Sequence, residues 1–192
     1  MTTIKDIRRW MHDNPRPCDD VIYKEIWEEH VYEKHYKLKP GDVVIDCGAH
    51  IGLFTIRAAE LVGPTGTVYA FEPEPDNFRL LSAHTIDHMN ILPYAFAVWH
   101  KATKIILLRA PANTGGHSIM WPENGHSPVA VDAIALDGFL TNLKRLNFLK
   151  IAVEGAEGHA LRGAQKMIER CRPHIAMEIH SKACFKAVKS IL

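Results

Sequence analysis

The sequence predicts an α/β protein in which a mostly parallel sheet lies between two layers of helices. Short apolar runs rich in β-branched residues alternate with segments of helical spacing, as buried parallel strands and their connecting helices do. The first run, residues 43–46, ends at an aspartate before a Gly-x-x-x-Gly turn, and the second run ends at Glu72. Open α/β sheets bind ligands at the carboxyl ends of such strands, so these two points mark the expected site.

Length and composition indicate one ordinary globular domain. The chain has 192 residues and a formal net charge of +1, which gives no reason to expect a nucleic-acid partner. Its first residues are charged and lack the apolar core of a signal peptide, and no apolar run approaches the roughly 18 to 20 residues of a membrane span. The four cysteines show no C-x-x-C spacing. We therefore expect reduced thiols and a cytoplasmic protein.

The chain is expected to begin with two helices. Residues 3–13 have helical spacing, and a helix there should stop at Asn14-Pro15-Arg16-Pro17, because proline disfavours helix in the residue before it. A second helix, capped by an aspartate, is expected over about residues 19–36. These helices form an N-terminal segment, residues 1–37, ahead of a main domain, residues 38–192. The segment either packs over the sheet edge or forms a lid over the site.

The first half of the main domain is expected to hold three strands separated by helices. A helix begins at Leu53 and ends at Gly63-Pro64, which is a stop signal. Pro73 and Pro75 start the next helix, where the missing N–H of proline is not needed. The three expected strands are residues 43–46, 67–71 and 90–98.

The second half is expected to hold four more strands. Two of them flank a Gly- and Pro-rich loop, residues 111–128, which is either a mobile surface loop or a flap that faces the substrate. The expected elements are strands 103–109 and 128–132, a helix over 137–146, a parallel strand 148–155, a helix closed by Pro173, a parallel strand 174–180 and a helix over 181–192.

The glycine turn and the acid after the second strand indicate a nucleoside cofactor. Gly48 and Gly52 can adopt backbone angles that a side chain forbids, which lets a ligand lie against the main chain. Asp46 can accept a hydrogen bond from an ammonium or hydroxyl group, and Glu72 can accept from both ribose hydroxyls. The turn lacks the G-x-G-x-x-G spacing of nicotinamide enzymes. S-adenosylmethionine therefore fits this pattern better than NAD does.

Three motifs together resemble the FkbM family of S-adenosylmethionine-dependent methyltransferases. They are Asp46-x-Gly48-Ala49-x-x-Gly52, Phe71-Glu72-Pro73-x-Pro75 and Lys150-Ile151-x-Val153-Glu154-Gly155. The resemblance covers roughly residues 38–180 and implies a three-layer, Rossmann-like class I methyltransferase sheet. Members of that family mostly methylate hydroxyl oxygens of sugars, polyketides and related small molecules. It therefore implies an O-methyltransferase with a small-molecule hydroxyl acceptor and S-adenosylhomocysteine as product.

The resemblance also implies a set of cofactor-binding residues. Those expected to line the methionine part are Asp46, Gly48, Ala49, His50 and Gly52. Those expected around the adenosine part are Glu72 at the ribose, Pro73 and Asn77 beside it, and Ala97 and Val98 at the adenine.

Methylation of a hydroxyl requires a base within hydrogen-bond reach of the acceptor proton. The candidates for catalysis are Glu154, His117 and His180. Glu154 is expected to lie at the mouth of the site, beside the sulfonium and the acceptor. Glu178, a further candidate base, precedes His180 by two residues on one expected strand. These two could form a metal site with Glu154, but we interpret them as a hydrogen-bonded structural pair, so no metal is expected.

Two departures from the family pattern bear on activity and assembly. The family has aspartate where this chain has Ala152, and alternation along a strand would place the missing carboxylate behind Glu154. We hypothesise that Ala152 makes the chain weakly active or inactive. Residues 181–192 are too few for a helix and the usual closing pair of antiparallel strands. We therefore expect the sheet to lack part of that pair, with a second copy or a partner over the open edge.

Rival functions differ in the residues that they require. A nucleic-acid methyltransferase needs a basic face and a pocket such as Asn-Pro-Pro-Tyr, and a nicotinamide oxidoreductase needs G-x-G-x-x-G; the sequence has neither. The alternative that remains open is a catalytically impaired or non-catalytic cofactor-binding or scaffold homologue.

Overall fold

The computed structural model describes residues 2–111, 113–120, 125–179 and 181–191. Its centre is a five-stranded sheet in the order β3-β2-β1-β7-β8, in which every neighbouring pair is parallel. The strands are β1 (Val43–Cys47), β2 (Thr67–Phe71), β3 (Ile91–Tyr94), β7 (Phe148–Ile151) and β8 (His174–Met177). The predicted fold class is confirmed. The strand order reverses between β1 and β7, and this switch point is where such sheets open a crevice for ligands.

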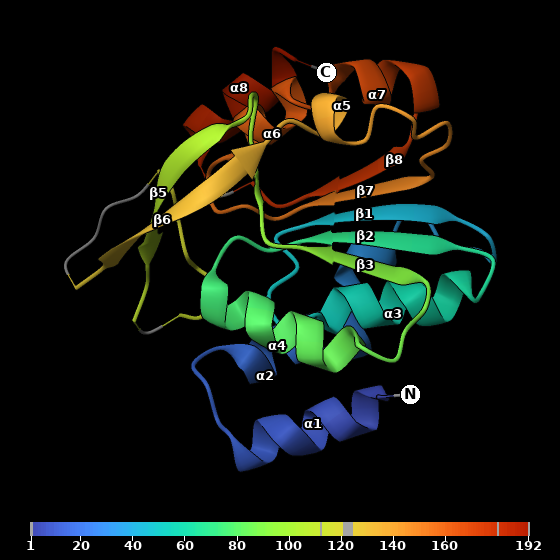
Figure 1. Ribbon diagram of the computed structural model, residues 1–192, viewed down its shortest axis with the longest axis vertical. Helices are drawn as coiled ribbons and strands as arrows, with labels where there is room; N and C mark the ends of the chain where they lie inside the picture. The colour runs from blue at the N-terminus through green and yellow to red at the C-terminus, as the bar shows by residue number, and fades with distance from the viewer. Residues whose placement is uncertain (1, 112, 121–124, 180, 192) are drawn as a thin grey trace.

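Helices cover both faces of the sheet, with α1 to α4 on one side and α5 to α8 on the other (Figure 1). The first group is α1 (Ile4–Asp13), α2 (Asp19–Tyr23), the π-helical turn η1 (Lys24–Glu28), the 3₁₀ turn η2 (Val31–Glu33), α3 (Leu53–Val62) and α4 (Pro75–Thr85). The second group is α5 (Leu136–Phe139), α6 (Glu157–Arg162), α7 (Gln165–Cys171) and α8 (Lys182–Lys189).

Two hydrophobic cores lie on the two faces of the sheet. Val44 and Phe148 pack in the core that contains α1 and α3, whereas Ile45 and Leu149 pack in the core that contains α6, α7 and α8. Neighbouring residues of one strand enter opposite cores because successive side chains point to opposite faces. These four side chains are at most 1% exposed. Burial on both faces explains why the strands appear in the sequence as unbroken apolar runs.

A second, three-stranded sheet lies beyond the carboxyl ends of the main strands (Figure 1). It consists of β4 (Ala97–Val98), β5 (Thr103–Arg109) and β6 (Ser127–Ile134), with β5 and β6 antiparallel and β4 and β6 parallel. The prediction of one strand over residues 90–98 was therefore wrong. The chain leaves the main sheet after Tyr94 and pairs with β6 from Ala97 onward, which divides that stretch into β3 and β4.

Several other predicted elements differ from the structure. β8 ends at Met177, short of the predicted strand end, and the single helix expected before Pro173 is divided into α6 and α7. β7 ends at Ile151 instead of residue 155, because Glu154 and Gly155 adopt left-handed backbone angles, φ 49° and 96°, that cannot continue a strand. The helix expected over residues 19–36 is broken at His30, where φ is 52°. The helix expected over 137–146 ends at Phe139.

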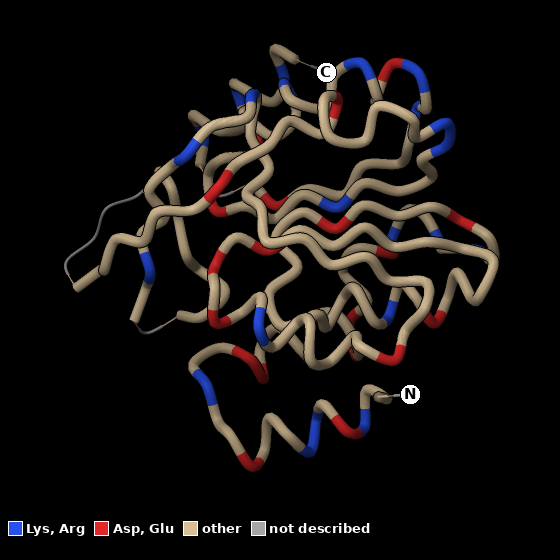
Figure 2. The backbone as a smooth tube through the Cα atoms, in the orientation of Figure 1, with Lys and Arg blue, Asp and Glu red and all other residues tan. Residues whose placement is uncertain are grey.

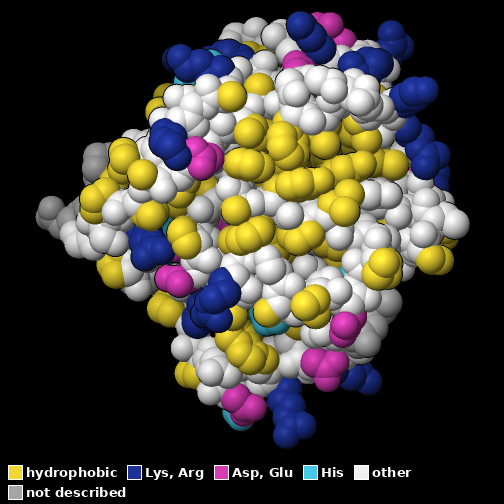
Figure 3. Space-filling view, in the orientation of Figure 1, with side chains coloured by type: hydrophobic (Ala, Val, Ile, Leu, Met, Phe, Trp, Pro, Cys, Tyr) yellow, Lys and Arg dark blue, Asp and Glu magenta, His cyan; other side chains and the backbone are white. Residues whose placement is uncertain are grey.

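Apolar side chains gather on the surface over β3 and below α5 (Figure 3). The rings of Phe71, Tyr94, Phe96 and Phe139 form a cluster between the ends of β2 and β3 and α5, with centroids 5.2 Å apart for Phe71–Tyr94 and 5.0 Å apart for Tyr94–Phe139. Lys and Arg residues lie mainly around this face, toward α7 and α8 (Figure 2). No helix of the described ranges is long and apolar enough to cross a membrane.

Gly163, which follows α6, packs against the backbone of the loop after β4. We predict that a side chain at this position lowers the stability of the fold. A Cβ at residue 163 would lie 1.9 Å from the carbonyl oxygen of Trp99, whereas a Cβ at Gly138 would meet nothing within 4 Å. Gly163→Ala should lower the free energy of unfolding by about 1–3 kcal/mol through overpacking, while Gly138→Ala should change it by less than about 0.5 kcal/mol. Urea unfolding measures both, and equal stabilities of the two variants would contradict the prediction.

Candidate functional site

The turn between β1 and α3 approaches the exit of β7 more closely than a side chain allows. Gly48 has φ 79°, and a Cβ there would lie 1.9 Å from the carbonyl oxygen of Ala152. Gly52 has φ 96°, and a Cβ there would lie 2.9 Å from Cδ1 of Leu81 on α4. Both positions therefore require glycine, as the turn chemistry predicts. The result is a stretch of bare backbone at the switch point of the sheet.

Asp46 lies behind this turn and is fully buried. One carboxylate oxygen lies 3.0 Å from Nζ of Lys150, and the other accepts a hydrogen bond of 2.7 Å from the Thr55 hydroxyl. Nζ of Lys150 also donates to the carbonyl of Gly48 at 2.6 Å. Asp46, expected to contact the cofactor, is fully enclosed in this structure and supports the turn through Lys150. The sequence analysis missed Lys150 as its partner; the signal was a lysine inside an apolar strand.

Glu72 stands at the carboxyl end of β2 and is 5% exposed. Its two oxygens accept hydrogen bonds from the backbone N–H groups of His50, at 2.7 Å, and Glu74, at 2.9 Å. Burial raises the pKa of Glu72 to about 7, although these two hydrogen bonds favour the charged form. A carboxylate oxygen can accept more than one hydrogen bond, so Glu72 retains acceptor capacity toward a ligand.

A cleft with about 550 Å³ of empty space opens beside Glu72, and we call it the main cleft. The cleft brings together residues that the sequence analysis assigned to the cofactor: Gly48, His50, Glu72, Pro73, Asn77, Ala97 and Val98. Its apolar wall is extended by Phe71, Phe96, Leu107, Ile119 and Val153. Ala97 and Val98 are each 3% exposed, so they offer a buried apolar surface.

A second space of about 820 Å³, the inner chamber, continues from the main cleft toward the N-terminal segment. The two spaces share the wall residues Gly48, His50, Gly115, Ala152 and Glu154. Ala49 lies on the chamber side. The chamber's outer wall comes from the N-terminal segment: Cys18, Val21, Ile22, Glu25, Ile26 and Tyr32. That segment therefore lies over the site, although its separate identity as a domain stays a prediction.

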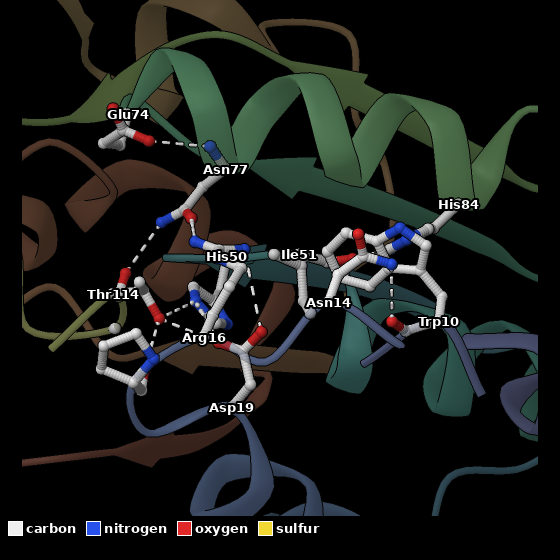
Figure 4. Close-up of polar contacts among 12 residues, drawn as sticks. Trp10, Asn14, Arg16, Asp19, His50, Ile51, Glu74, Asn77, His84 and Thr114 are labelled. Atoms are coloured by element: carbon white, nitrogen blue, oxygen red, sulfur yellow. Dashed lines mark hydrogen bonds and ion pairs between the residues drawn. The ribbon is translucent and has the colours of Figure 1, made fainter. Parts of the chain in front are cut away.

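Residues from four distant parts of the chain meet beside the wall that the two spaces share at His50 (Figure 4). We call this group, Arg16, Asp19, His50, Asn77 and Thr114, the clasp. Arg16 donates to the side-chain carbonyl of Asn77, whose amide donates to the carbonyl of Thr114 at 2.9 Å. Oγ1 of Thr114 lies 2.8 Å from Oδ1 of Asp19 and 3.2 Å from Nε2 of His50. The clasp was not predicted, because no local motif marks Arg16 or Thr114.

The clasp defines the proton position on His50. The Thr114 hydroxyl has one proton, and two acceptors compete for it: the carbonyl of Pro17 and the Asp19 carboxylate, each at 2.8 Å. With its proton directed to one of these acceptors, the Thr114 oxygen can only accept from Nε2 of His50, so Nε2 has the proton. Nδ1 of His50 is then left with a lone pair. Burial, above all, lowers the pKa of His50 to about 3, so the ring is neutral. Nδ1 is buried and has no hydrogen-bond partner among the described residues.

The three candidate bases differ in position. Glu154 lies in a left-handed turn after β7 and lines both the main cleft and the inner chamber. Strand alternation does not relate it to Ala152, because β7 has already ended; both residues nevertheless line the two spaces. His117 lines the main cleft, and its Nδ1 accepts a hydrogen bond of 3.0 Å from the N–H of Ala110. His180 lies outside the described residues.

Burial lowers the pKa of His117, so its ring is neutral near pH 7, with the proton on Nε2. In that form the ring presents a donor, not a base, to the cleft. Within the described ranges, no group of three or more His, Cys, Asp or Glu residues could hold a metal ion.

Comparisons of the sequence with known proteins find a methyltransferase family. The family model described as "Methyltransferase FkbM domain" matches residues 46–190. The 31-O-demethyl-FK506 methyltransferase FkbM of Streptomyces tacrolimicus is 46% identical over 68 residues, which are 35% of this chain and 26% of that protein. Methyltransferase 1 of Beauveria bassiana is 27% identical over 90% of this chain and 78% of its own length.

Two solved structures share the fold. The methyltransferase FkbM of Methylobacillus flagellatus matches 95% of this chain with a TM-score of 0.61 and 17% identity, and the match covers 42% of that chain. Aeropyrum pernix fibrillarin, solved with natively bound S-adenosyl-L-methionine, matches 88% of this chain and 64% of its own with a TM-score of 0.56 and 13% identity. The match to the Streptomyces relative and the match to the Methylobacillus structure each span less than half of that protein's length.

The raised pKa of Glu72 predicts a pH dependence of stability. Between pH 4.5 and about 7 the folded state binds the Glu72 proton and the unfolded state does not, so this group's contribution to stability is lost as pH rises through that window. As pH rises from 4.5 to about 7, the free energy of unfolding of the natural chain, relative to that of Glu72→Gln, should therefore fall by on the order of 3 kcal/mol.

Denaturant unfolding at several pH values measures this difference, with Glu60→Gln, an exposed carboxylate on α3, as matched control. A difference between the natural chain and Glu72→Gln that does not change with pH would contradict the prediction.

Proposed function

This chain belongs to the FkbM methyltransferase family, and on that premise we propose that it transfers a methyl group from S-adenosylmethionine to a hydroxyl oxygen of a small molecule or sugar. The observation that carries the proposal is the main cleft, in which the bare backbone at Gly48, the Glu72 carboxylate and the apolar pair Ala97 and Val98 meet at the switch point of the sheet. The printed name of the Streptomyces relative, a 31-O-demethyl-FK506 methyltransferase, supports oxygen as the methylated atom.

The residues of the cleft fit S-adenosylmethionine. Gly48 packs against the carbonyl of Ala152 and exposes main chain on the cleft wall, and the neutral His50 offers an acceptor nitrogen without repelling a cation. Glu72 can accept hydrogen bonds from the ribose hydroxyls, with Pro73 and Asn77 beside it. Ala97 and Val98 form an apolar surface for the adenine. After methyl transfer the same residues would hold the product, S-adenosylhomocysteine.

When bound, the cofactor supplies an electrophilic methyl group: the acceptor oxygen bonds to the methyl carbon while the C–S bond breaks and its electron pair returns to sulfur. The chain's own contribution is to hold both reactants at bonding distance, which lowers the entropic part of the barrier. Glu154 lies on the wall shared by the two spaces and is our candidate to take the hydroxyl proton. The N-terminal segment forms the outer wall of the inner chamber.

A second candidate function follows from Ala152. This residue lines both spaces at the point where the family motif has an aspartate. A carboxylate there would lie near the candidate base Glu154, and its loss can leave a chain that binds the cofactor without turnover. A cofactor-binding or scaffold homologue is therefore the alternative.

Titration calorimetry tests the proposed cofactor. We expect S-adenosylmethionine and S-adenosylhomocysteine to bind the purified chain with a one-to-one stoichiometry, and NAD to show no binding. The reason is that Glu72 and the glycine turn can accept the adenosine and methionine groups but provide no pyrophosphate site. A folded chain that binds neither adenosyl compound would overturn the proposed function.

Restoring the carboxylate at position 152 tests which of the two functions holds. Ala152→Asp should raise the turnover of methyl transfer by about tenfold or more, as expected when a base or its support is restored, and should leave the affinity for S-adenosylmethionine within about twofold. Ala152→Asn is the matched control of equal size without charge. Transfer of labelled methyl to a panel of hydroxyl compounds measures the turnover, and equal rates for the natural chain and Ala152→Asp would sink the hypothesis.

A further inference from the structure

The face of the main sheet that carries α5 is uncovered toward β3. The register of the sheet aligns Ile45 of β1, Tyr69 of β2 and Leu92 of β3 in one row. Ile45 is 0% exposed, Tyr69 is partly exposed and Leu92 is 39% exposed, so the cover decreases from the centre of the sheet to its edge. The cause is α5, which has four residues and packs beside the carboxyl ends of β2 and β3, so it leaves this row open.

The uncovered surface is apolar and continues from β3 to the chain that follows α5. Phe139 of α5 contacts Tyr94 of β3 edge-on, and Leu140 and Leu143 pack, partly exposed, against the same core. Figure 3 shows the resulting apolar area over β3 and below α5. A sheet face in contact with water normally has polar side chains, so this surface is expected to have an occupant. We call it the apolar face, and its members are Tyr69, Leu92, Tyr94, Phe139, Leu140 and Leu143.

The segments beside the apolar face are basic. Residues 136–147 and 165–172 contain five Lys and Arg residues and two Asp and Glu residues, whereas the whole chain has a net charge of +1. Arg170 of α7 donates to the carbonyl of Leu143 at 3.0 Å, which places α7 against the apolar face. Lys and Arg side chains border the apolar area on this side (Figure 3). We call the five exposed cations the basic border: Lys144, Arg145, Lys166, Arg170 and Arg172.

The two acids of these segments do not neutralise the basic border. The carboxylate of Asp137 accepts hydrogen bonds from the backbone N–H groups of Lys166, at 2.9 Å, and Met167, at 2.8 Å, so it caps the first turn of α7. Glu169 is exposed on α7 and is outnumbered. Within the described ranges, no salt bridge joins a cation of the border to an acid. The border is therefore complementary to an anionic surface.

A lipid surface fits the apolar face better than a second copy of the chain does. Two apolar faces packed about a two-fold axis would bring two basic borders together, which is unfavourable between like charges. An anionic bilayer matches both features, because apolar side chains enter the headgroup boundary while Lys and Arg contact the headgroups. Tyr69 and Tyr94 have rings with an apolar body and a hydroxyl, a type of side chain enriched at that boundary.

From the uncovered apolar face and the basic border beside it, we propose that this side of the chain docks on the surface of a membrane that contains anionic lipid. The contact is peripheral, with Leu92 and Phe139 at the headgroup boundary and the cations of the border at the headgroups. The proposal goes beyond methyl transfer and does not depend on it.

Co-sedimentation with vesicles tests the proposal. In low salt the chain should bind vesicles of phosphatidylcholine with about 30% phosphatidylserine at least about tenfold more tightly than vesicles of phosphatidylcholine alone. High salt should remove this preference by screening. The double variant Lys144→Glu with Lys166→Glu should weaken binding to the mixed vesicles about twentyfold or more, because each cation near an anionic surface contributes about fivefold. Leu92→Gln should weaken it about threefold, since one apolar side chain leaves the boundary.

Two variants on other parts of the molecule serve as matched controls. Lys5→Glu with Arg9→Glu makes the same change of charge on α1, which lies on the other side of the sheet (Figure 1). Ile106→Gln replaces an apolar side chain of β5 that is 52% exposed. Both should leave vesicle binding unchanged, and thermal melts followed by circular dichroism confirm that each variant is folded.

Three outcomes would overturn the inference: binding to neither kind of vesicle, equal binding to both kinds, or binding that the double lysine variant and Leu92→Gln leave unchanged. Light scattering separates one rival occupant. A chain that self-associates through Leu92 and does not bind vesicles would assign the apolar face to a second copy and would also overturn the inference.

Discussion

A buried ion pair between two neighbouring strands supports the turn on which the site is built. Lys150 of β7 lies opposite Asp46 of β1 in the register of the sheet, and its ammonium lies 3.0 Å from the Asp46 carboxylate. The same ammonium holds the carbonyl of Gly48, while Thr55 donates to the other carboxylate oxygen. Removing one partner of such a pair leaves an uncompensated buried charge at a cost of about 3–5 kcal/mol. The positions of the cleft and the chamber therefore depend on this pair.

Features that depend on neighbours along the chain could be predicted from the sequence. Apolar runs predicted β1 and β2 nearly to the residue, because strands buried on both faces have no polar alternation to confuse the pattern. Glycine chemistry predicted that Gly48 and Gly52 adopt backbone angles closed to other residues. The position of Glu72 in the site could be predicted because this residue follows the end of a strand. The family resemblance added the methyltransferase type of sheet and eight of the residues that line the main cleft.

Features that depend on distant residues could not be predicted in this way. Asp46 was expected to face the ligand, and only its contact with Lys150, from a strand far along the chain, shows that it faces the interior. The early end of β7 results from the backbone angle of Glu154, for which a non-glycine residue gives no local signal. The clasp joins the N-terminal segment to the loop after β5 through Asp19 and Thr114, two residues without any shared motif.

The clasp has a consequence for the kinetics of binding. One hydroxyl, that of Thr114, contacts both the N-terminal segment, at Asp19, and the wall between the two spaces, at His50. Movement of the segment away from the wall therefore opens the inner chamber, whose outer wall the segment forms. Exchange of a ligand in that chamber then proceeds at the rate of this local opening, which depends on the stability of a few polar contacts and not on the affinity of the site. Residence time and affinity become separate properties, so a molecule bound weakly at equilibrium can still be retained for long.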